Sequence, residues 1–394
     1  MKYYRLTAQL LSPLMIQQDR QSNAPTALDY LPGSTLRGSV AATYLRMGAS
    51  PEDPDFRHLF LDQPVHFPNL FPSDSSETIP KVLPLTAASC KRHPGFLGQG
   101  GHGVADNLAA AVYSHLSGKA AGTDFGRCPE CNHDMKPFGG FWSGDVIYSR
   151  KSDSTLLYQR HTGIDRATGT VAPSIFFALQ MIADFHKRSP TSHEPDGEEF
   201  HRQSLCGGVF LDDEHLRILK ALVEYSSVFA GGDRTRGFGE MKLSIEEASP
   251  PTFDLKGWNL ALRGKLGRLF QIELPAGIYF SLKLESPAIL VDAFLRASPQ
   301  ITLPFPGVEP VLRVAKARIV RGWQSAWGLP KPDDTGLAMG SVCLFRHPGL
   351  EADNLNGLEN FLAGLLTGGI GLRREEGFGK VSICDCLHEI EEVI

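Results

Sequence analysis

The chain has 394 residues, 42% hydrophobic and 21% charged, a composition typical of a globular protein with two or three domains. Its formal net charge of −5 at pH 7 argues against a uniformly basic nucleic-acid-binding surface, although it is compatible with a local basic groove. The chain lacks an apolar run of membrane-spanning length and an N-terminal signal core, and it has an odd number of cysteines, so we expect a cytoplasmic protein without membrane contact.

Two parts of the chain begin with the same pattern. Residues 4–16 alternate in hydrophobicity as a strand does and contain Ser12-Pro13. Residues 279–291 repeat this pattern around Ser286-Pro287. The repeat indicates an internal duplication, in which the first copy carries insertions. We therefore predict an α+β protein with one domain over residues 1–250 and a second over residues 251–394.

The segment Leu31-Pro-Gly-Ser-Thr-Leu-Arg-Gly38 predicts the start of a helix, with Ser34 or Thr35 as the N-cap. Free amides at Gly33 and the following residues, together with the cation of Arg37, would form an anion site at the helix N-terminus. Simple capping, with no ligand, is the alternative.

A Cys-x-x-Cys pair, Cys128-Pro-Glu-Cys131, indicates a metal site. Thiolates two residues apart bind one Zn²⁺ tetrahedrally when two further ligands complete the site. Cys90 is the expected third ligand and His102 the expected fourth, with His93 and His133 as alternatives. We predict structural zinc in an insertion over roughly residues 85–140 of the first domain; unmetallated thiols are the alternative.

The segment from Gln159 to Val171 has the composition of a polar hairpin tip with two glycines. Its hydroxyl, guanidinium and imidazole groups suit contacts to an RNA backbone or a 2′-hydroxyl. A hairpin that faces only water is the alternative. The residues predicted to contact RNA are Arg160, His161, Arg166 and Thr168.

Each of the two parts ends in a glycine-rich loop that follows a helical pattern and precedes a strand pattern. Each loop contains Gly-Gly, two arginines and Gly-Phe-Gly. Glycine permits positive φ, successive amides can bind an anion, and guanidinium groups suit phosphate. The sequence therefore predicts two phosphate-binding loops, and glycine turns with solvated arginines are the alternative. The residues are Gly231, Gly232, Arg234, Arg236, Gly237, Phe238 and Gly239 in the first loop, and Gly368, Gly369, Arg373, Arg374, Gly377, Phe378 and Gly379 in the second.

A cationic stretch precedes Trp323 and Trp327, and cations beside aromatic rings fit single-stranded RNA or a groove on another protein. Burial of both tryptophans in a core is the alternative. The cations are Arg313, Lys316, Arg318 and Arg321.

The Ser-Pro strands, the Leu31–Gly38 segment, the Thr162–Thr170 segment and the two Gly-Phe-Gly loops together resemble the CRISPR-associated RAMP superfamily over nearly the whole chain. The double layout and the cysteine insertion most resemble the large double-RAMP (Csx-series) subunits of type III-D effector complexes. This resemblance implies two tandem ferredoxin-like (RRM-like) domains, each βαββαβ, with a zinc-binding insertion in the first.

The resemblance also implies a non-catalytic subunit that binds guide RNA (crRNA) at its 5′ handle in antiviral defence. Its partners would be the backbone RAMP subunits and the large polymerase-like subunit, with target RNA recognised indirectly through base pairing. By position, the phosphate-binding loops would be Gly231–Gly239 and Gly368–Gly379, and the hairpin Ile164–Thr170.

Two alternative functions remain open from the sequence. One is an endoribonuclease that uses Asp19 or Asp29, or His161 as a general acid or base. The other is a zinc-containing interaction module without direct RNA contact.

Overall fold

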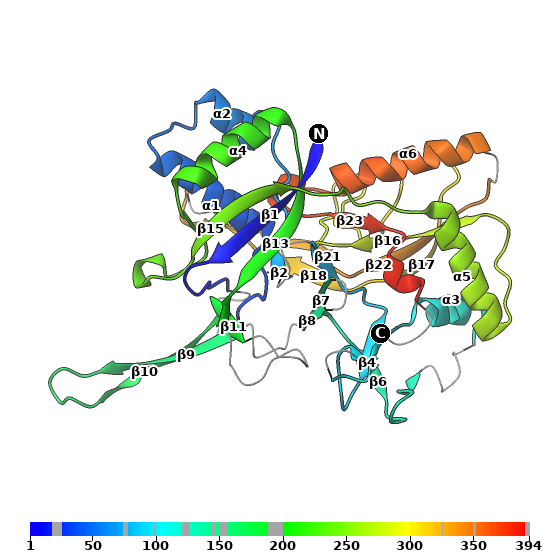
Figure 1. Cartoon of the computed structure of the whole chain (residues 1–394), viewed down its shortest axis with the longest axis horizontal. Coiled ribbons are helices and arrows are strands. Elements are labelled where there is room, and N and C mark those ends of the chain that lie inside the picture. Colours follow the sequence, from blue (N-terminus) through cyan, green and yellow to red (C-terminus); the bar gives the residue numbers. More distant parts are fainter. Residues whose placement is uncertain are drawn as a thin grey trace. The chain divides into compact units, whose positions relative to one another are not determined.

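The computed structural model of the protein describes all residues except 18–25, 74–77, 98–99, 120–125, 144–145, 150–155, 188–199, 325, 350–351 and 391–394. The backbone divides into two compact units (Figure 1). Unit 1 comprises Met1–Pro80 and Arg150–Pro250, and unit 2 comprises Lys81–Ser149 and Pro251–Ile394. Residues 81–149 thus belong with the C-terminal part, whereas the sequence predicted them within a first domain over residues 1–250.

Unit 1 is built on a five-stranded antiparallel sheet in the order β14-β15-β1-β13-β2. The central strand β1 (Lys2–Leu10) pairs with β13 (Ser204–Leu211) on one side and β15 (Glu240–Glu247) on the other. The strands β14 (Val228–Phe229) and β2 (Phe71–Ser73) form the edges.

Helices of unit 1 cover this sheet and enclose its core (Figure 1). The buried face of α4 carries Ile218, Leu219 and Leu222 at helical spacing, and these side chains pack in one cluster with apolar residues of β1. The helices are α1 (Gly33–Arg46), α2 (Pro54–Arg57), the π-helix η1 (His58–Asp62), α4 (Asp213–Tyr225) and the 3-10 helix η4 (Arg234–Arg236). The remaining strand pairs are β9 (Leu156–Ile164) with β10 (Val171–Ile182), and β11 (Phe185–Lys187) with β12 (Phe200–Arg202).

Unit 2 is built on a four-stranded antiparallel sheet in the order β17-β22-β16-β23. Its strands are β16 (Ile278–Leu284), β17 (Glu309–Val314), β22 (Val342–His347) and β23 (Val381–Ile383). When the four strands are numbered by their order along the chain, their order across the sheet is 2-3-1-4. The strands β2-β13-β1-β15 of unit 1 have the same order. The counterpart of α4 is α6 (Ala352–Gly368), but residues 285–308, between the first two strands, form no helix.

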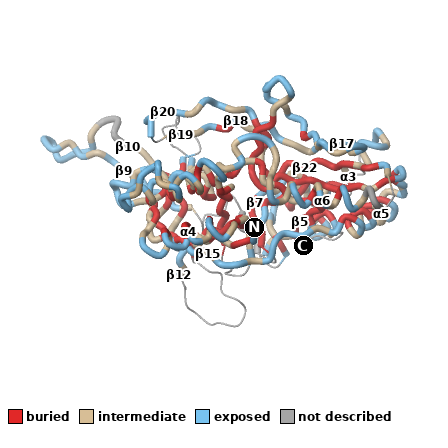
Figure 2. The backbone as a smooth tube through the Cα atoms, turned by 90° about the horizontal axis from the view of Figure 1, so that it is seen from above, coloured by how far each residue is buried: buried red, intermediate tan, exposed pale blue. Residues whose placement is uncertain are grey.

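The described rest of unit 2 comprises two α-helices, two 3-10 helices and small sheets, and Figure 2 shows many buried residues along its main sheet. The helices are α3 (Leu108–Ser117), α5 (Leu255–Phe270) and the 3-10 helices η5 (Arg374–Glu376) and η6 (Cys386–His388). One small sheet contains β3 (Lys81–Val82), β7 (Gly140–Ser143) and β8 (Val146–Ser149), and another contains β5 (Val104–Asp106), β4 (Ala87–Cys90) and β6 (Met135–Pro137). The strand pairs are β18 (Ala317–Val320) with β21 (Asp334–Leu337), and β19 (Trp323–Gln324) with β20 (Leu329–Pro330). None of the helices in the described part of the chain is long and apolar enough to cross a membrane.

A buried ionic cluster explains why residues 81–149 belong to unit 2. The Lys283 side chain on β16 is 0% exposed, and its Nζ lies 2.6 Å from Asp385 Oδ2 and 3.0 Å from Glu285 Oε1. The same Nζ donates to the Val82 carbonyl oxygen at 2.6 Å, and Glu285 Oε2 accepts the Val82 amide at 2.8 Å. Separating β3 from β16 would leave these buried polar groups without their Val82 partners, which costs about 1–3 kcal/mol for each group.

The buried cluster makes a prediction about stability and pH. Burial opposes ionisation of Asp385, but the charge of Lys283 outweighs it and holds the pKa of this carboxyl far below its usual value. Because the pKa is lower in the folded than in the unfolded chain, the pair stabilises the fold above about pH 4. This stabilisation is lost as the pH falls from about 4 through the folded-state pKa.

We expect Asp385→Asn to lower the free energy of unfolding by about 3–5 kcal/mol at pH 7, because it removes the nearer of the two carboxylates that pair with the buried Lys283. The variant should also lose less stability than the parent on acidification below about pH 4, which urea unfolding at several pH values measures. The control is Asp333→Asn, which breaks an exposed pair with Arg321 and should cost at most about 1 kcal/mol. Equal stability of the parent and Asp385→Asn would contradict this account.

Candidate functional site

The first glycine loop, residues 230–240, is held by hydrogen bonds to the segment that follows β1. The Gly239 amide donates to the Pro13 carbonyl oxygen at 2.9 Å, and the Gly232 amide donates to the Met15 carbonyl oxygen at 3.0 Å. Gly231 and Gly239 have φ values of 76° and 83°. A Cβ atom at either position would overlap a backbone carbonyl oxygen, so these positions require glycine.

The second glycine loop, residues 370–380, repeats this arrangement in unit 2. The Gly379 amide donates to the Pro287 carbonyl oxygen at 2.8 Å, and the Leu372 amide donates to the Ile289 carbonyl oxygen at 2.9 Å. The serine of each Ser-Pro pair also accepts an amide: Ser12 Oγ from Glu240 at 2.9 Å and Ser286 Oγ from Lys380 at 2.8 Å.

These hydrogen bonds correct the alignment of the two loops that the sequence suggested. Leu372 occupies the place of Gly232, and Gly371, with a φ of 78°, is the counterpart of Gly231. Gly368 is instead the last residue of α6, and Gly369 follows it. The Gly-Gly motif of the second part therefore belongs to the end of the helix and is not the equivalent of Gly231-Gly232.

The corrected alignment shows that the two loops carry different charges. Glu376 occupies the position of Arg236, and Arg373 occupies the position of Asp233. Arg373 pairs with Asp334 at 2.8 Å and with Glu376 at 2.7 Å, and Glu376 also pairs with Lys331 at 2.8 Å. Burial opposes ionisation of Glu376, but hydrogen bonds from Arg373 and Lys331 outweigh it and lower its pKa. Arg373 is thus neutralised within unit 2.

The cations of the first loop are more accessible. Arg234 is exposed and forms no ion pair with any residue that the structure describes. Arg236 pairs with Asp233 at 3.2 Å, but both side chains are partly exposed, and such a pair contributes little. The Arg236 guanidinium also lies 5.9 Å from the ring centroid of Phe177.

Phe177 joins the first loop to the hairpin formed by β9 and β10. It lies directly opposite His161 in the hairpin, and the two rings stack with centroids 5.0 Å apart. Phe177 and Phe238 both pack against a small apolar cluster made of Met15, Leu179 and Met181. The predicted residues His161, Arg236 and Phe238 therefore lie together around Phe177. Sequence reasoning missed Phe177, which the pairing of the two hairpin strands places opposite His161.

The hairpin extends from unit 1 as a long arm (Figure 1). At its tip, Asp165 Oδ1 accepts the Ala167 amide at 2.7 Å, and the hydroxyls of Thr168 and Thr170 lie 2.8 Å apart. Arg160, Arg166 and Thr168 are exposed. Ile164 and Val171, which flank the tip, are 67% and 62% exposed, so the tip presents apolar as well as polar groups.

The N-terminus of α1 differs from the prediction. Pro32 is the N-cap and makes no side-chain cap hydrogen bond, so the expected capping by Ser34 or Thr35 is wrong. Asn69 Oδ1 accepts the Gly33 amide at 2.8 Å instead. Arg37 donates to the Phe60 carbonyl oxygen at 2.8 Å, which ties its guanidinium to η1.

Two of the three residues considered for nuclease activity lie within the described part of the chain. Asp19 lies outside the described residues, and Asp29 is partly buried. His161 Nε2 is buried and has no hydrogen-bond partner among the described residues.

The tryptophans of the cationic stretch do not lie in a core. Trp327 is 75% exposed and Trp323 is 43% exposed. Trp323 belongs to the short pair β19 and β20, which offers too little buried surface for a large ring.

The cysteine cluster in unit 2 confirms the predicted set of four residues, Cys90, His102, Cys128 and Cys131, whose ligating atoms all lie within 4.8 Å of one another. The Sγ atoms of Cys90 and Cys131 are 3.5 Å apart, and Cys128 Sγ is 3.5 Å from His102 Nδ1. Tetrahedral zinc would separate two thiolates by about 3.8 Å and a thiolate from an imidazole nitrogen by about 3.6 Å. The four residues therefore fit a metal ion.

The two alternative histidines lie outside this set. His133 Nδ1 is 2.9 Å from the Cys131 carbonyl oxygen, and His93 stacks on His102 with ring centroids 4.3 Å apart. Burial disfavours the Cys90 thiolate, but the backbone amides of His93 and Arg92 outweigh it and lower the pKa of this thiol. His93 and His133 thus contact residues of the cluster but do not belong to its four candidate ligands.

Three solved structures illustrate distant likenesses. The type III-B Cmr-beta complex bound to cognate target RNA and AMPPnP contains a chain 13% identical, covering 91% of this chain and 93% of that chain with a TM-score of 0.44. A Cas6 product complex is 10% identical, covering 48% and 79% with a TM-score of 0.28. Oligomeric Cmr4 from Pyrococcus furiosus is 13% identical, covering 63% and 100% with a TM-score of 0.26. These likenesses are too weak to assign a role.

Comparison at the level of sequence is more decisive. A search of curated proteins found no match. The family model described as the RAMP superfamily, however, matches residues 7–242, more than half of the chain. The matched range includes both the Ser12-Pro13 segment and the first glycine loop that it holds, and this chain therefore belongs to the RAMP superfamily.

Proposed function

We propose that this protein is an RNA-binding structural subunit of a type III CRISPR effector complex, and that it binds guide RNA without cleaving it. The observation that carries the proposal is the junction at Phe177, where the first glycine loop meets the hairpin. A guanidinium, an imidazole and two aromatic rings meet there, and such groups bind phosphates and stack on bases.

Each part of this junction has a separate role in the proposal. Arg234 is exposed and unpaired among the described residues, so it is available to an RNA phosphate. Arg236 needs only to exchange an exposed partner, Asp233, for a phosphate. The exposed hairpin residues Arg160, Arg166 and Thr168 would extend the contact along the strand of RNA.

The second glycine loop contributes less to RNA binding in this proposal. Arg373 would have to leave two carboxylates before it could bind a phosphate. Arg374 is exposed, but its guanidinium donates to the Gly368 carbonyl oxygen at 3.1 Å. We therefore assign RNA contact chiefly to unit 1.

We further propose that both units are ferredoxin-like RAMP domains in tandem, which their shared strand order supports. A double RAMP chain with a cysteine insertion corresponds to the large subunit of a type III-D complex. Such a subunit would hold the 5′ handle of the guide and contact backbone RAMP proteins and the polymerase-like subunit.

The cysteine cluster is proposed to hold structural zinc. Four protein ligands complete a tetrahedral shell and leave no position for a reacting water, as in structural rather than catalytic sites. Cys90 is the last residue of β4, so the ion would link the end of this strand to the turn at Cys128 and Cys131.

The RNA proposal is tested with the purified full-length chain and a fluorescently labelled guide RNA. Arg234→Ala should weaken binding severalfold and reduce the slope of log K against log salt by about 0.7, because one phosphate contact to a single strand is lost. Arg374→Ala, the equivalent substitution in the second loop, is the control and should change binding less. Unchanged binding by Arg234→Ala would contradict the proposal.

The same mixture, incubated with target RNA and Mg²⁺, tests the nuclease alternative. We expect both RNAs to remain intact. Cleavage by the parent that disappears in Asp29→Ala would instead identify an endoribonuclease.

The zinc proposal predicts a change in bound metal. Cys128→Ser should lower the zinc content by about one equivalent per chain, because three remaining ligands hold the ion weakly. Cys386→Ser, which replaces an exposed cysteine of unit 2 outside the cluster, should leave the content unchanged. Equal zinc in the parent and Cys128→Ser would rule out the site.

A further inference from the structure

A second group of metal-binding side chains lies in unit 1, where η1 meets α4. His58 begins η1, Asp212 is the N-cap of α4, and His215 lies in the first turn of that helix. Asp212 Oδ2 is 3.0 Å from His215 Nδ1 and 3.9 Å from His58 Nε2. All three ligating atoms lie within 4.8 Å of one another.

The two oxygens of Asp212 have separate roles. Oδ1 accepts the His215 amide at 2.7 Å and so caps α4. This hydrogen bond fixes the carboxylate and turns Oδ2 toward both imidazole rings. The helix cap therefore presents one carboxylate oxygen to the two histidines.

The hydrogen bonding of His215 determines which of its nitrogens can bind a ligand. Its ring is 1% exposed, and Nε2 lies 2.9 Å from the Gln63 carbonyl oxygen. Because a carbonyl only accepts, Nε2 carries the hydrogen, and Nδ1 of the neutral ring has a lone pair. Metal-binding histidines commonly donate their other N–H to a carbonyl in this way.

The lone pair of His215 Nδ1 faces another acceptor, Asp212 Oδ2, at 3.0 Å. Two acceptors at this distance repel each other unless a proton or a metal ion lies between them. The Nδ1 atom is buried and makes no hydrogen bond, so the geometry does not favour a shared proton. A metal ion satisfies both atoms at once.

His58 supplies the third donor. Its Nε2 is also buried without a hydrogen-bond partner, and its ring stacks on His215 with centroids 4.3 Å apart. Donor atoms around tetrahedral zinc lie about 3.3 Å apart, a value between the two measured separations from Asp212.

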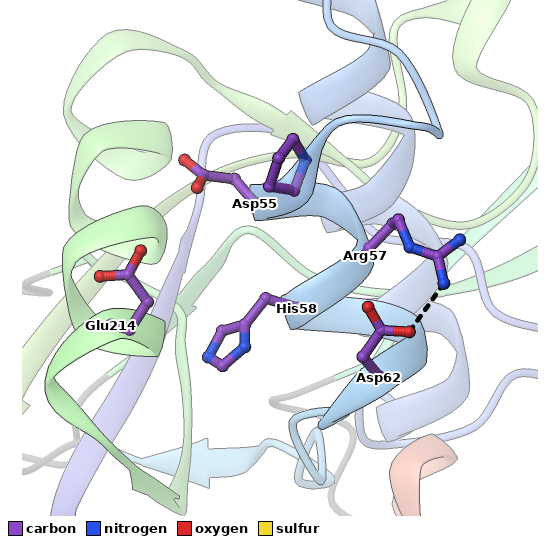
Figure 3. A pocket seen from close by; sticks show the side chains of 6 residues that line it. Asp55, Arg57, His58, Asp62 and Glu214 are labelled. Carbon is purple, nitrogen blue, oxygen red and sulfur yellow. Dashed lines mark hydrogen bonds and ion pairs between the residues drawn. The ribbon is translucent and has the colours of Figure 1, made fainter.

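A surface pocket of about 440 Å³ lies beside His58 and gives access to this group. In Figure 3, His58 and Glu214 project from neighbouring helices, and Arg57 pairs with Asp62 of the same helical segment. Glu214 is paired with Arg217 at 2.6 Å. Because Asp62 and Glu214 are already paired with arginines, the two histidines and Asp212 remain as donors for an ion. The pocket can supply a water molecule.

We propose that His58, Asp212 and His215 bind a divalent transition-metal ion of the zinc class, with a water from the pocket as fourth ligand. Two imidazoles and one carboxylate are a donor set that zinc and cobalt accept. The ion would link η1 to the first turn of α4. This site is independent of the proposed RNA binding and of the cysteine cluster in unit 2.

The test is a cobalt titration of the full-length chain, because Co²⁺ distinguishes the two sites by their ligands. Thiolate ligands give an intense charge-transfer band in the near ultraviolet, whereas nitrogen and oxygen ligands give only weak visible bands. We expect two equivalents of Co²⁺ in the parent. His58→Phe keeps the ring stacking but should bind about one equivalent less, with the charge-transfer band unchanged.

The matched control is Asp213→Asn, which removes an exposed charge next to Asp212 and should retain both equivalents. His58 is preferred for substitution because its side chain is 26% exposed, whereas His215 is 1% exposed and its replacement could unfold α4. Equal cobalt binding by the parent and His58→Phe would overturn the proposal. An equal loss in Asp213→Asn would also overturn it, since the ion would then bind a diffuse acidic surface.

Discussion

In each unit, backbone hydrogen bonds attach the last loop to the segment that follows the first strand. Gly239 donates to Pro13 in unit 1, and Gly379 donates to Pro287 in unit 2. The first and last strands are neighbours in both sheets, so these bonds set where the last strand begins. Glycine is required at both positions because a Cβ atom would overlap a carbonyl oxygen of the loop itself, that of Ala230 in unit 1 and of Ile370 in unit 2. The two units thus share one hydrogen-bond pattern at this loop.

On this shared frame the two units have different electrostatics. In unit 1 Arg234 and Arg236 are exposed, whereas in unit 2 Arg373 is only partly exposed and pairs with two carboxylates. Unit 2 also contains the fully buried Lys283 pair and the cysteine cluster, features that favour a rigid scaffold. These differences agree with the proposal that RNA contact lies chiefly in unit 1.

Local patterns in the sequence predicted much of this arrangement. The repeated Ser-Pro strands and the Cys-x-x-Cys spacing depend on near neighbours, and the four expected residues, including His102, do converge. Sequence reasoning failed where distant residues decide the outcome. The amide at Gly33 is capped by Asn69 rather than Ser34, and residues 81–149 join unit 2 because Val82 contacts Lys283. The loop alignment failed because Gly-Gly also suits a helix end.

The central claim is that guide RNA lies against the junction at Phe177. Ultraviolet cross-linking of the full-length protein to guide RNA, followed by mass spectrometry of the linked peptides, tests it most directly, because aromatic rings in contact with bases form cross-links. The account predicts cross-links within residues 156–182 and 230–240, including Phe177 or Phe238. Cross-links confined to unit 2, with none in these two segments, would contradict it.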